Sequence, residues 1–184
     1  MEHEELQARL KEADALYRDG KLDAALQAYQ DVLAIDGGIA WAHSRVGAIL
    51  AQQEDLAGAE QSLVKALELD PALPQAHSNL GNVYYARGDY EAALAKYRTA
   101  ATLDPDNPTY QTNLHAAYKK LGKVSEAIAA LKQAHRLDRQ YAREEAKTRM
   151  ATVRQSLSRG RGCFGSVVTI LSIATILTVL LVAM

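Results

Sequence analysis

The chain has 184 residues, enough for one domain of ordinary size and an additional segment. With a net charge of −1 and 23% charged residues, it has no overall basic signature of a nucleic-acid-binding protein. The only cysteine, Cys163, excludes an intrachain disulfide. Residues 1–9 are charged and contain no apolar stretch, so no secretory signal peptide is expected there.

The charges are unevenly distributed along the chain. Residues 1–70 contain 14 acidic and 6 basic residues, whereas residues 136–161 contain 8 basic and 3 acidic residues. The basic segment directly precedes an apolar C-terminal stretch. This arrangement predicts a contact with a membrane surface or with a specific acidic partner.

A period of 34 residues runs through most of the sequence. Gly88 and Gly122 are separated by this interval, and an aspartate recurs at the same interval. Small residues recur with the same spacing at Ala25, Ala59, Ala93 and Ala127. The period divides the chain into four units without insertions or deletions: 6–39, 40–73, 74–107 and 108–141.

Each unit has the pattern of two helices joined by a short turn. In the third unit, the first helix is expected over 75–87 and the second over 90–103, because apolar residues recur with helical spacing. Gly88 and Asp89 form the expected turn, and Pro105 ends the second helix. A single helix pair cannot bury its own apolar face, so the units are expected to stack.

This pattern resembles the tetratricopeptide repeat family over residues 6–141. The matching residues in the third unit are Leu80, Gly81, Tyr84, Gly88, Tyr90, Ala93, Tyr97, Ala100 and Pro105. The resemblance implies an all-α, right-handed superhelical solenoid. Three first-helix positions depart from the family pattern, because His43, His77 and Gln111 replace its tryptophan. His115 also replaces a small residue, so looser packing is expected in unit four.

Residues 142–158 continue the helical pattern in the same phase and are predicted to form a capping helix. Ala146, Met150 and Val153 are expected to face inward, with arginine and lysine outward. Residues 159–162 are expected to be a short linker.

Residues 163–184 form an uncharged and largely apolar stretch of 22 residues. A helix of that length is about 33 Å long, which is enough to cross the ~30 Å core of a bilayer. The stretch therefore predicts a C-terminal transmembrane anchor. The preceding arginines favour a repeat domain that faces the cytoplasm. A buried soluble helix is the alternative, and Cys163 is a candidate for lipidation.

The sequence contains no phosphate-binding loop, no paired CxxC motif and no HExxH motif. His43 and His77 occupy one repeat position, which favours packing over metal binding. Neither a cofactor nor a metal ion is expected, and the chain is not expected to be an enzyme.

In the resembled family the first helices line a concave groove that binds peptides. The resemblance implies protein-binding positions at Trp41, Arg45, Ser78, Asn79, Asn82, Tyr85, Asn113, Lys119, Arg143 and Lys147. It also implies that Ser44, Gln75 and Thr109 face the groove. Asparagine both donates and accepts hydrogen bonds, which suits the main chain of an extended peptide.

A carboxylate-binding version of this groove is a narrower alternative. Some co-chaperones of the family hold a C-terminal carboxylate with lysine, arginine and asparagine. Asn82, Asn113, Arg143 and Lys147 match those positions, but Ser78 stands where the first lysine is required.

The sequence as a whole predicts a membrane-anchored scaffold or assembly factor that recruits a protein through its groove. A co-chaperone-type receptor is one alternative. The other is an accessory subunit that the transmembrane helix holds in a membrane complex.

Overall fold

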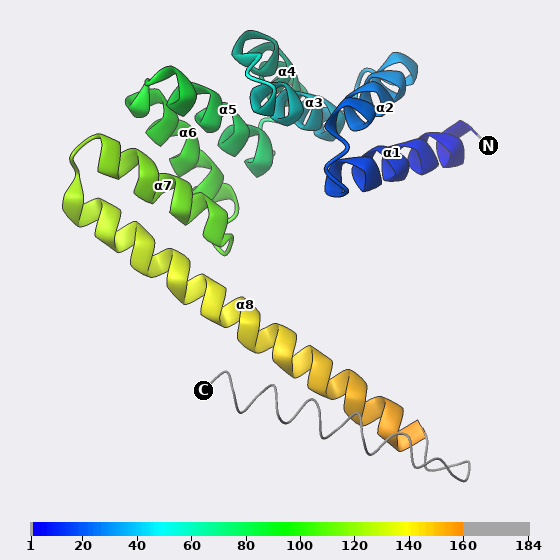
Figure 1. The fold of residues 1–184 in the computed structure, drawn as a ribbon, viewed down its shortest axis with the longest axis vertical. Helices are drawn as coiled ribbons and strands as arrows, with labels where there is room; N and C mark the ends of the chain where they lie inside the picture. Colours follow the sequence, from blue (N-terminus) through cyan, green and yellow to red (C-terminus); the bar gives the residue numbers. More distant parts are fainter. Residues whose placement is uncertain (1, 160–184) are drawn as a thin grey trace. The chain divides into compact units, whose positions relative to one another are not determined.

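The structure, a computed structural model, describes residues 2–159, and it consists of helices in that part of the chain (Figure 1). The helices are α1 (Glu2–Arg18), α2 (Leu22–Ile35), α3 (Ala40–Gln52), α4 (Leu56–Leu69), α5 (Pro74–Arg87), α6 (Tyr90–Leu103), α7 (Pro108–Lys120) and α8 (Val124–Arg159). The chain divides into two units, residues 1–139 and 140–184. We call them the repeat unit and the C-terminal unit.

The helices of the repeat unit form a stack of pairs, which confirms the predicted all-α repeat solenoid. The second helices begin at Leu22, Leu56, Tyr90 and Val124, one 34-residue period apart. Each helix of the described pairs α1–α2, α3–α4 and α5–α6 packs against its partner, and α2, α4 and α6 each contact the next first helix. The first helices α3, α5 and α7 also contact one another in succession.

Small residues allow the paired helices to approach closely. The recurring alanines Ala25, Ala59 and Ala93 are completely buried. A Cβ atom at Gly81 would lie 2.5 Å from the ring of Tyr97, and one at Gly47 would lie 2.6 Å from the Leu63 side chain. The helix crossings therefore depend on residues without a bulky side chain.

The turns inside the four pairs share one backbone conformation. Gly20, Gly88 and Gly122 have positive φ values of 74°, 86° and 70°. Glu54 occupies the same register position and has φ 66°, although this left-handed conformation disfavours residues with a side chain. Repeat geometry thus imposes the turn even where the sequence lacks glycine.

Residues 142–158, predicted as a capping helix, are helical, but they are part of one long helix and not a separate element. The second helix of the fourth pair continues without a break through Asp138 to Arg159. Earlier second helices end at Ile35, Leu69 and Leu103, and the aspartate after each of them is followed by glycine or proline. Asp138 is followed by Arg139, which keeps its amide and does not end a helix.

The residues of this segment that were predicted to face inward are exposed instead. Met150 and Val153 are exposed, by 67% and 39%, and Ala146 is exposed as well. None of the helices described within residues 2–159 is both long enough and apolar enough to span a membrane. The predicted anchor at 163–184, Cys163 and the linker residues 160–162 lie outside the described residues.

Replacing Glu54 with glycine is expected to stabilise the repeat unit. The left-handed conformation costs a residue with a side chain about 1–2 kcal/mol, and the greater freedom of glycine in the unfolded chain offsets part of that gain. The expected net gain is about 0.5–1 kcal/mol in the free energy of unfolding, measured by urea denaturation in a mild detergent. The reciprocal change Gly88→Ala is expected to lower stability. A loss of stability in Glu54→Gly would contradict this account of the turn.

Candidate functional site

The repeat unit contains a hollow along its first helices, which we call the groove. Its volume is about 280 Å³. The lining residues come from α1, α3, α5 and α7 and the turn before α7: Tyr17, Trp41, Ser44, Arg45, Gln75, Ser78, Asn79, Asn82, Asn107, Thr109, Tyr110 and Asn113. A second hollow of about 310 Å³ shares Tyr17, Asn79 and Asn82 with it. The groove is lined mainly by polar residues, whereas the second hollow is also lined by Ala48, Ala51, Leu56 and Ala86.

Two equivalent hydrogen bonds connect successive first helices beneath the groove. The amide of Asn79 donates to Ser44 Oγ at 3.5 Å, and the amide of Asn113 donates to Ser78 Oγ at 3.0 Å. Ser44 and Ser78 are buried, so each hydroxyl needs a partner. The pairs are offset by one 34-residue period, and they fix the spacing of α3, α5 and α7.

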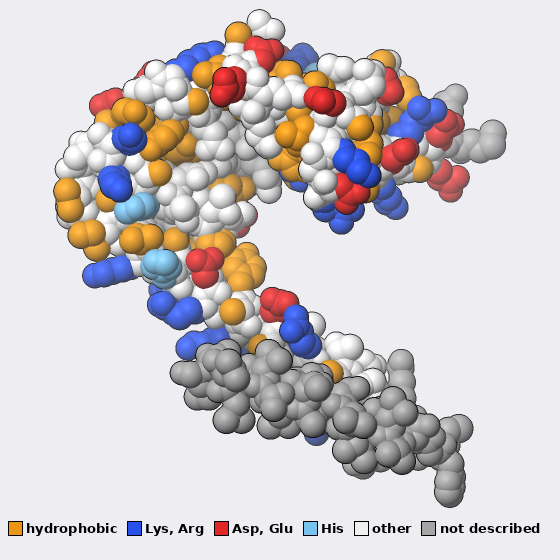
Figure 2. Space-filling view, viewed as in Figure 1, with side chains coloured by type: hydrophobic (Ala, Val, Ile, Leu, Met, Phe, Trp, Pro, Cys, Tyr) orange, Lys and Arg blue, Asp and Glu red, His pale blue; other side chains and the backbone are white. Residues whose placement is uncertain are grey.

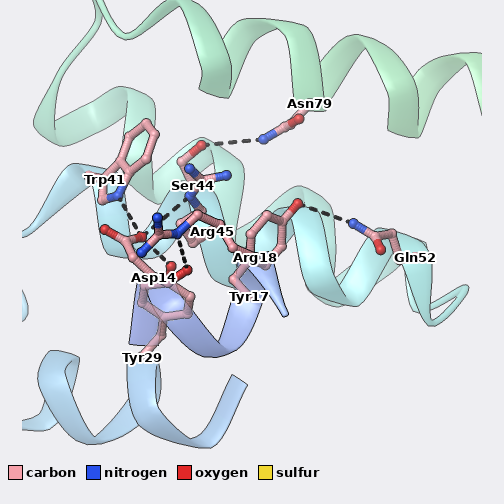
Figure 3. A network of polar contacts seen from close by, with 9 residues as sticks. All are labelled: Asp14, Tyr17, Arg18, Tyr29, Trp41, Ser44, Arg45, Gln52 and Asn79. Atoms are coloured by element: carbon pink, nitrogen blue, oxygen red, sulfur yellow. Dashed lines mark hydrogen bonds and ion pairs between the residues drawn. The ribbon is translucent and has the colours of Figure 1, made fainter. Parts of the chain in front are cut away.

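Arg45 lies at one end of the groove between two aromatic rings (Figure 3). Its guanidinium carbon lies 4.6 Å from the ring centroid of Tyr17 and 4.1 Å from that of Trp41. Its Nε lies 3.8 Å from Asp14 Oδ1, which also accepts a hydrogen bond from Trp41 Nε1 at 3.3 Å. Arg45 is the only charged side chain among these lining residues, and Asp14 balances its charge, although its buried Nε makes no hydrogen bond with the described residues.

At one repeat position, the second helices carry tyrosine and leucine in turn. The first-helix residue that faces a tyrosine is polar, and its equivalent opposite leucine is apolar. The hydroxyl of Tyr29 donates to Asp14, and that of Tyr97 donates to Asn82 Oδ1 at 2.8 Å. Both acceptors precede the tyrosine by 15 residues. Leu63 replaces tyrosine in the second pair, and Ala48 stands 15 residues before it. A polar residue of the paired first helix is therefore present where a buried hydroxyl requires an acceptor.

Burial and the acceptor at Asp14 both raise the pKa of Tyr29, with burial the larger cause. Burial likewise raises the pKa of Tyr97. Both tyrosines therefore hold their protons well above the pH at which an exposed tyrosine ionises.

Tyr110 adds a buried hydroxyl without a partner to the groove lining. Its side chain is 3% exposed, and its oxygen has no hydrogen-bond partner among the described residues. A bound group that offered a donor or an acceptor would satisfy it. The lining thus consists mainly of neutral hydroxyl and amide groups, while charged and apolar side chains are interspersed over the outer surface seen in Figure 2.

Six of the ten positions predicted from the sequence lie together in the groove. They are Trp41, Arg45, Ser78, Asn79, Asn82 and Asn113.

Four predicted positions do not line it. Tyr85 packs edge-to-face against Tyr90, with ring centroids 5.2 Å apart. Lys119 is exposed and lines neither hollow. Arg143 and Lys147 belong to the C-terminal unit, and Lys147 pairs with Glu144 at 2.6 Å.

The sequence prediction missed Tyr17, Asn107 and Tyr110. Tyr17 shares its register position with Tyr85, so the period itself could have identified it. Tyr110 stands where the two preceding units have the buried alanines Ala42 and Ala76. A large polar residue at a small-residue position was the available signal.

The histidines at the repeat position of His43 and His77 have a structural role. Nε2 of His43 lies 3.1 Å from the carbonyl of Gly37, and Nε2 of His77 lies 2.9 Å from that of Pro71. Each ring thereby ties the start of a first helix to the preceding turn. Among residues 2–159, no group of histidine, cysteine and carboxylate side chains is placed to hold a metal ion.

Family models match the sequence at four places. A model described as TPR repeat matches residues 47–86 and 81–122, and two models described as tetratricopeptide repeat match residues 3–38 and 116–141. No curated protein matches the chain.

Solved structures show the same fold. The crystal structure of MamA is 21% identical, with a TM-score of 0.64 over 75% of this chain and 81% of that chain. MamA 41-end from Desulfovibrio magneticus RS-1 is 21% identical, with a TM-score of 0.63 over 73% and 76% of the two chains. A mutant O-GlcNAc transferase of Thermobaculum terrenum is 29% identical, with a TM-score of 0.60 over 61% of this chain but 22% of that chain.

Alkaline pH is expected to destabilise the repeat unit through Tyr29 and Tyr97. Because their pKa values are raised in the folded state, the unfolded chain loses these protons first, near pH ~10. Their contribution is therefore complete below that pH and is lost as the pH rises above it.

The double variant Tyr29→Phe/Tyr97→Phe tests this dependence. It is expected to be about 2 kcal/mol less stable at neutral pH, because two buried hydrogen bonds are lost. Above pH ~10 its stability should fall less steeply than that of the unmodified chain, as measured by thermal unfolding in detergent. Tyr141→Phe, at an exposed position, is the control. Equal alkaline slopes for all three proteins would disprove the role of the two tyrosines.

Proposed function

Because the chain belongs to the tetratricopeptide-repeat family, we propose that it is a membrane-anchored scaffold that recruits a protein partner by binding an extended segment in the groove. It carries out no reaction of its own in this proposal. The repeat fold generally serves protein interaction, and the proposal adds the groove, the ligand class and the membrane.

The neutral, hydrogen-bonding lining of the groove is the observation that carries the proposal. Gln75, Asn79 and Asn82 of α5 offer amide donors and acceptors, and Tyr110 of α7 offers an unpartnered hydroxyl. The main chain of an extended peptide presents the complementary groups at regular spacing. Trp41 and Tyr17 provide an aromatic end that can hold an apolar side chain of the peptide.

The charge arrangement favours this peptide over an isolated carboxylate. Arg45 is held by Asp14, so its charge is already balanced. Asn113 uses an amide hydrogen to bind Ser78. Asn82 and Asn113 do share the groove, so a co-chaperone-type carboxylate site is the second candidate.

Membrane anchoring is supported by the sequence of residues 163–184, whose 22 uncharged, largely apolar residues suffice to cross a bilayer. The basic residues before this segment favour a repeat unit on the cytoplasmic side. A partner bound in the groove would then be concentrated at the membrane surface.

A groove variant, Gln75→Ala/Asn82→Ala/Thr109→Ala, is expected to lose the partner. Removing the Asn82 acceptor leaves the Tyr97 hydroxyl unpaired and costs about 1–3 kcal/mol of stability, so circular dichroism is used to check that the solenoid stays folded. Three hydrogen bonds at about 1 kcal/mol each correspond to binding that is weaker on the order of 100-fold. The full chain is purified from its native membranes in mild detergent, and the partner is quantified by mass spectrometry. The affinity is then measured with the purified partner.

The matched control is Gln30→Ala/Gln61→Ala/Thr102→Ala, which changes exposed residues of the second helices. Retention of the partner by the groove variant, or its loss from the control, would reject the groove as the binding site. Loss of binding to a partner peptide when its C-terminus is amidated would select the carboxylate-binding alternative.

Deletion of residues 163–184 is expected to release the chain from membranes while groove binding persists. Replacing the segment with an unrelated transmembrane helix should restore both the membrane location and the partner complex, as judged by membrane flotation and co-purification. If the foreign helix restores the location without the complex, the chain is instead an accessory subunit held by specific packing of its own tail.

A further inference from the structure

The last part of α8, residues 140–156, is exposed at every position. Two ion pairs on its surface, Lys147–Glu144 at 2.6 Å and Arg149–Glu145 at 3.0 Å, join residues of this same segment. Such exposed pairs contribute little to stability, and helices of this length are marginal without a packed face. A surface that covered one side of the segment would stabilise it.

The segment has two chemically different sides. At 100° per residue, Ala142, Ala146, Met150 and Val153 fall within an arc of about 80°, which we call the apolar stripe. The opposite side carries Glu144, Thr148, Thr152 and Gln155. Met150 and Val153 are exposed by 67% and 39%, so the stripe lies open.

Basic residues border the stripe on both sides. Arg143, Lys147 and Arg154 follow one edge, and Arg149 stands at the other. Residues 140–156 contain four basic and two acidic residues. Glu144 lies opposite the stripe, and Glu145 lies on the side of Arg149, about 60° from the edge of the stripe. The ion pairs of Lys147 and Arg149 are highly exposed, so either cation can exchange its carboxylate for another anion.

We propose that residues 140–156 lie flat on an anionic lipid surface, with the apolar stripe in the interface and the bordering cations on lipid phosphates. An apolar stripe with basic borders is the pattern of helices that lie in the membrane interface. The inference extends the proposed anchoring at 163–184, which would keep this helix beside the bilayer. It adds a second membrane contact that depends on lipid charge.

The same charges oppose the pairing of two copies of this helix. In a coiled coil, Ala146, Met150 and Val153 would form the seam, and Lys147, Arg149 and Arg154 would flank it. All three flanking residues are positive and would repel their counterparts. The seam is also shorter than the three to four heptads that a coiled coil usually needs.

Site-specific labels can test which side of the helix meets lipid. Cys163 is first replaced by serine, and a polarity-sensitive fluorophore is attached to the full chain at Met150→Cys or at Thr148→Cys, which lies on the opposite side at nearly the same height. The proteins are reconstituted into phosphatidylcholine vesicles with or without ~30% phosphatidylserine, and quenching by lipid-borne nitroxide is measured.

The label at position 150 is expected to be quenched several-fold more than the label at 148 in the anionic vesicles. The difference should shrink without phosphatidylserine and in ~0.5 M salt, because the attraction is electrostatic. Equal quenching at the two positions would overturn the proposal. So would shielding of position 150 by a second copy, detected as label–label contact without lipid quenching.

Neutralising the border tests the charge requirement separately. Arg143→Gln/Lys147→Gln/Arg154→Gln is expected to abolish the excess quenching at position 150. The matched control Lys21→Gln/Lys65→Gln/Lys96→Gln removes three charges from the repeat unit and should preserve it. Equal effects of the two variants would show that net charge alone, and not this helix, directs the contact.

Flotation of the same vesicles separates this inference from the anchoring proposal. If the chain floats but position 150 is not quenched, anchoring stands and the interfacial helix is rejected. If a chain lacking 163–184 is still quenched at position 150 by added anionic vesicles, the interfacial helix stands independently of the anchor.

Discussion

The close approach of paired helices at small residues is the constraint on which the rest of the structure depends. No single helix pair can bury its apolar face, so each pair is stable only when it packs against its neighbours. Gly47 and Gly81 leave no room for a Cβ atom beside Leu63 and Tyr97. This packing fixes the distance between helices, and the constant 34-residue period repeats it along the chain.

The same packing places polar groups in the interior, where each needs a partner. The Tyr97 hydroxyl reaches Asn82, and Ser78 accepts a hydrogen bond from Asn113. These bonds orient the amides that line the groove. The groove is therefore pre-formed by contacts that also stabilise the solenoid. Because its lining side chains are already ordered, ligand binding loses less conformational entropy.

The two units of the chain differ in the interactions they can offer. The groove of the repeat unit is lined by neutral donors and acceptors, and its single arginine is balanced by Asp14. The C-terminal unit instead presents an open apolar stripe between cations. A neutral groove suits a peptide main chain, whereas a basic amphipathic helix suits an anionic surface. The proposed scaffold would use the first for its partner and the second for its membrane.

The sequence by itself determined the repeat, the helix pairs and most of the groove, because a period of 34 residues places equivalent residues in equivalent environments. The sequence also contained signals for Tyr17 and Tyr110 that the prediction did not use. Only the tertiary structure decided which groove residues are committed to internal bonds, because Arg45 meets Asp14 and Asn113 meets Ser78 across helices that are distant in sequence. It also decided the exposure of Met150. A residue with helical spacing is buried only if another element packs against it, and residues 140–156 of α8 are exposed at every position.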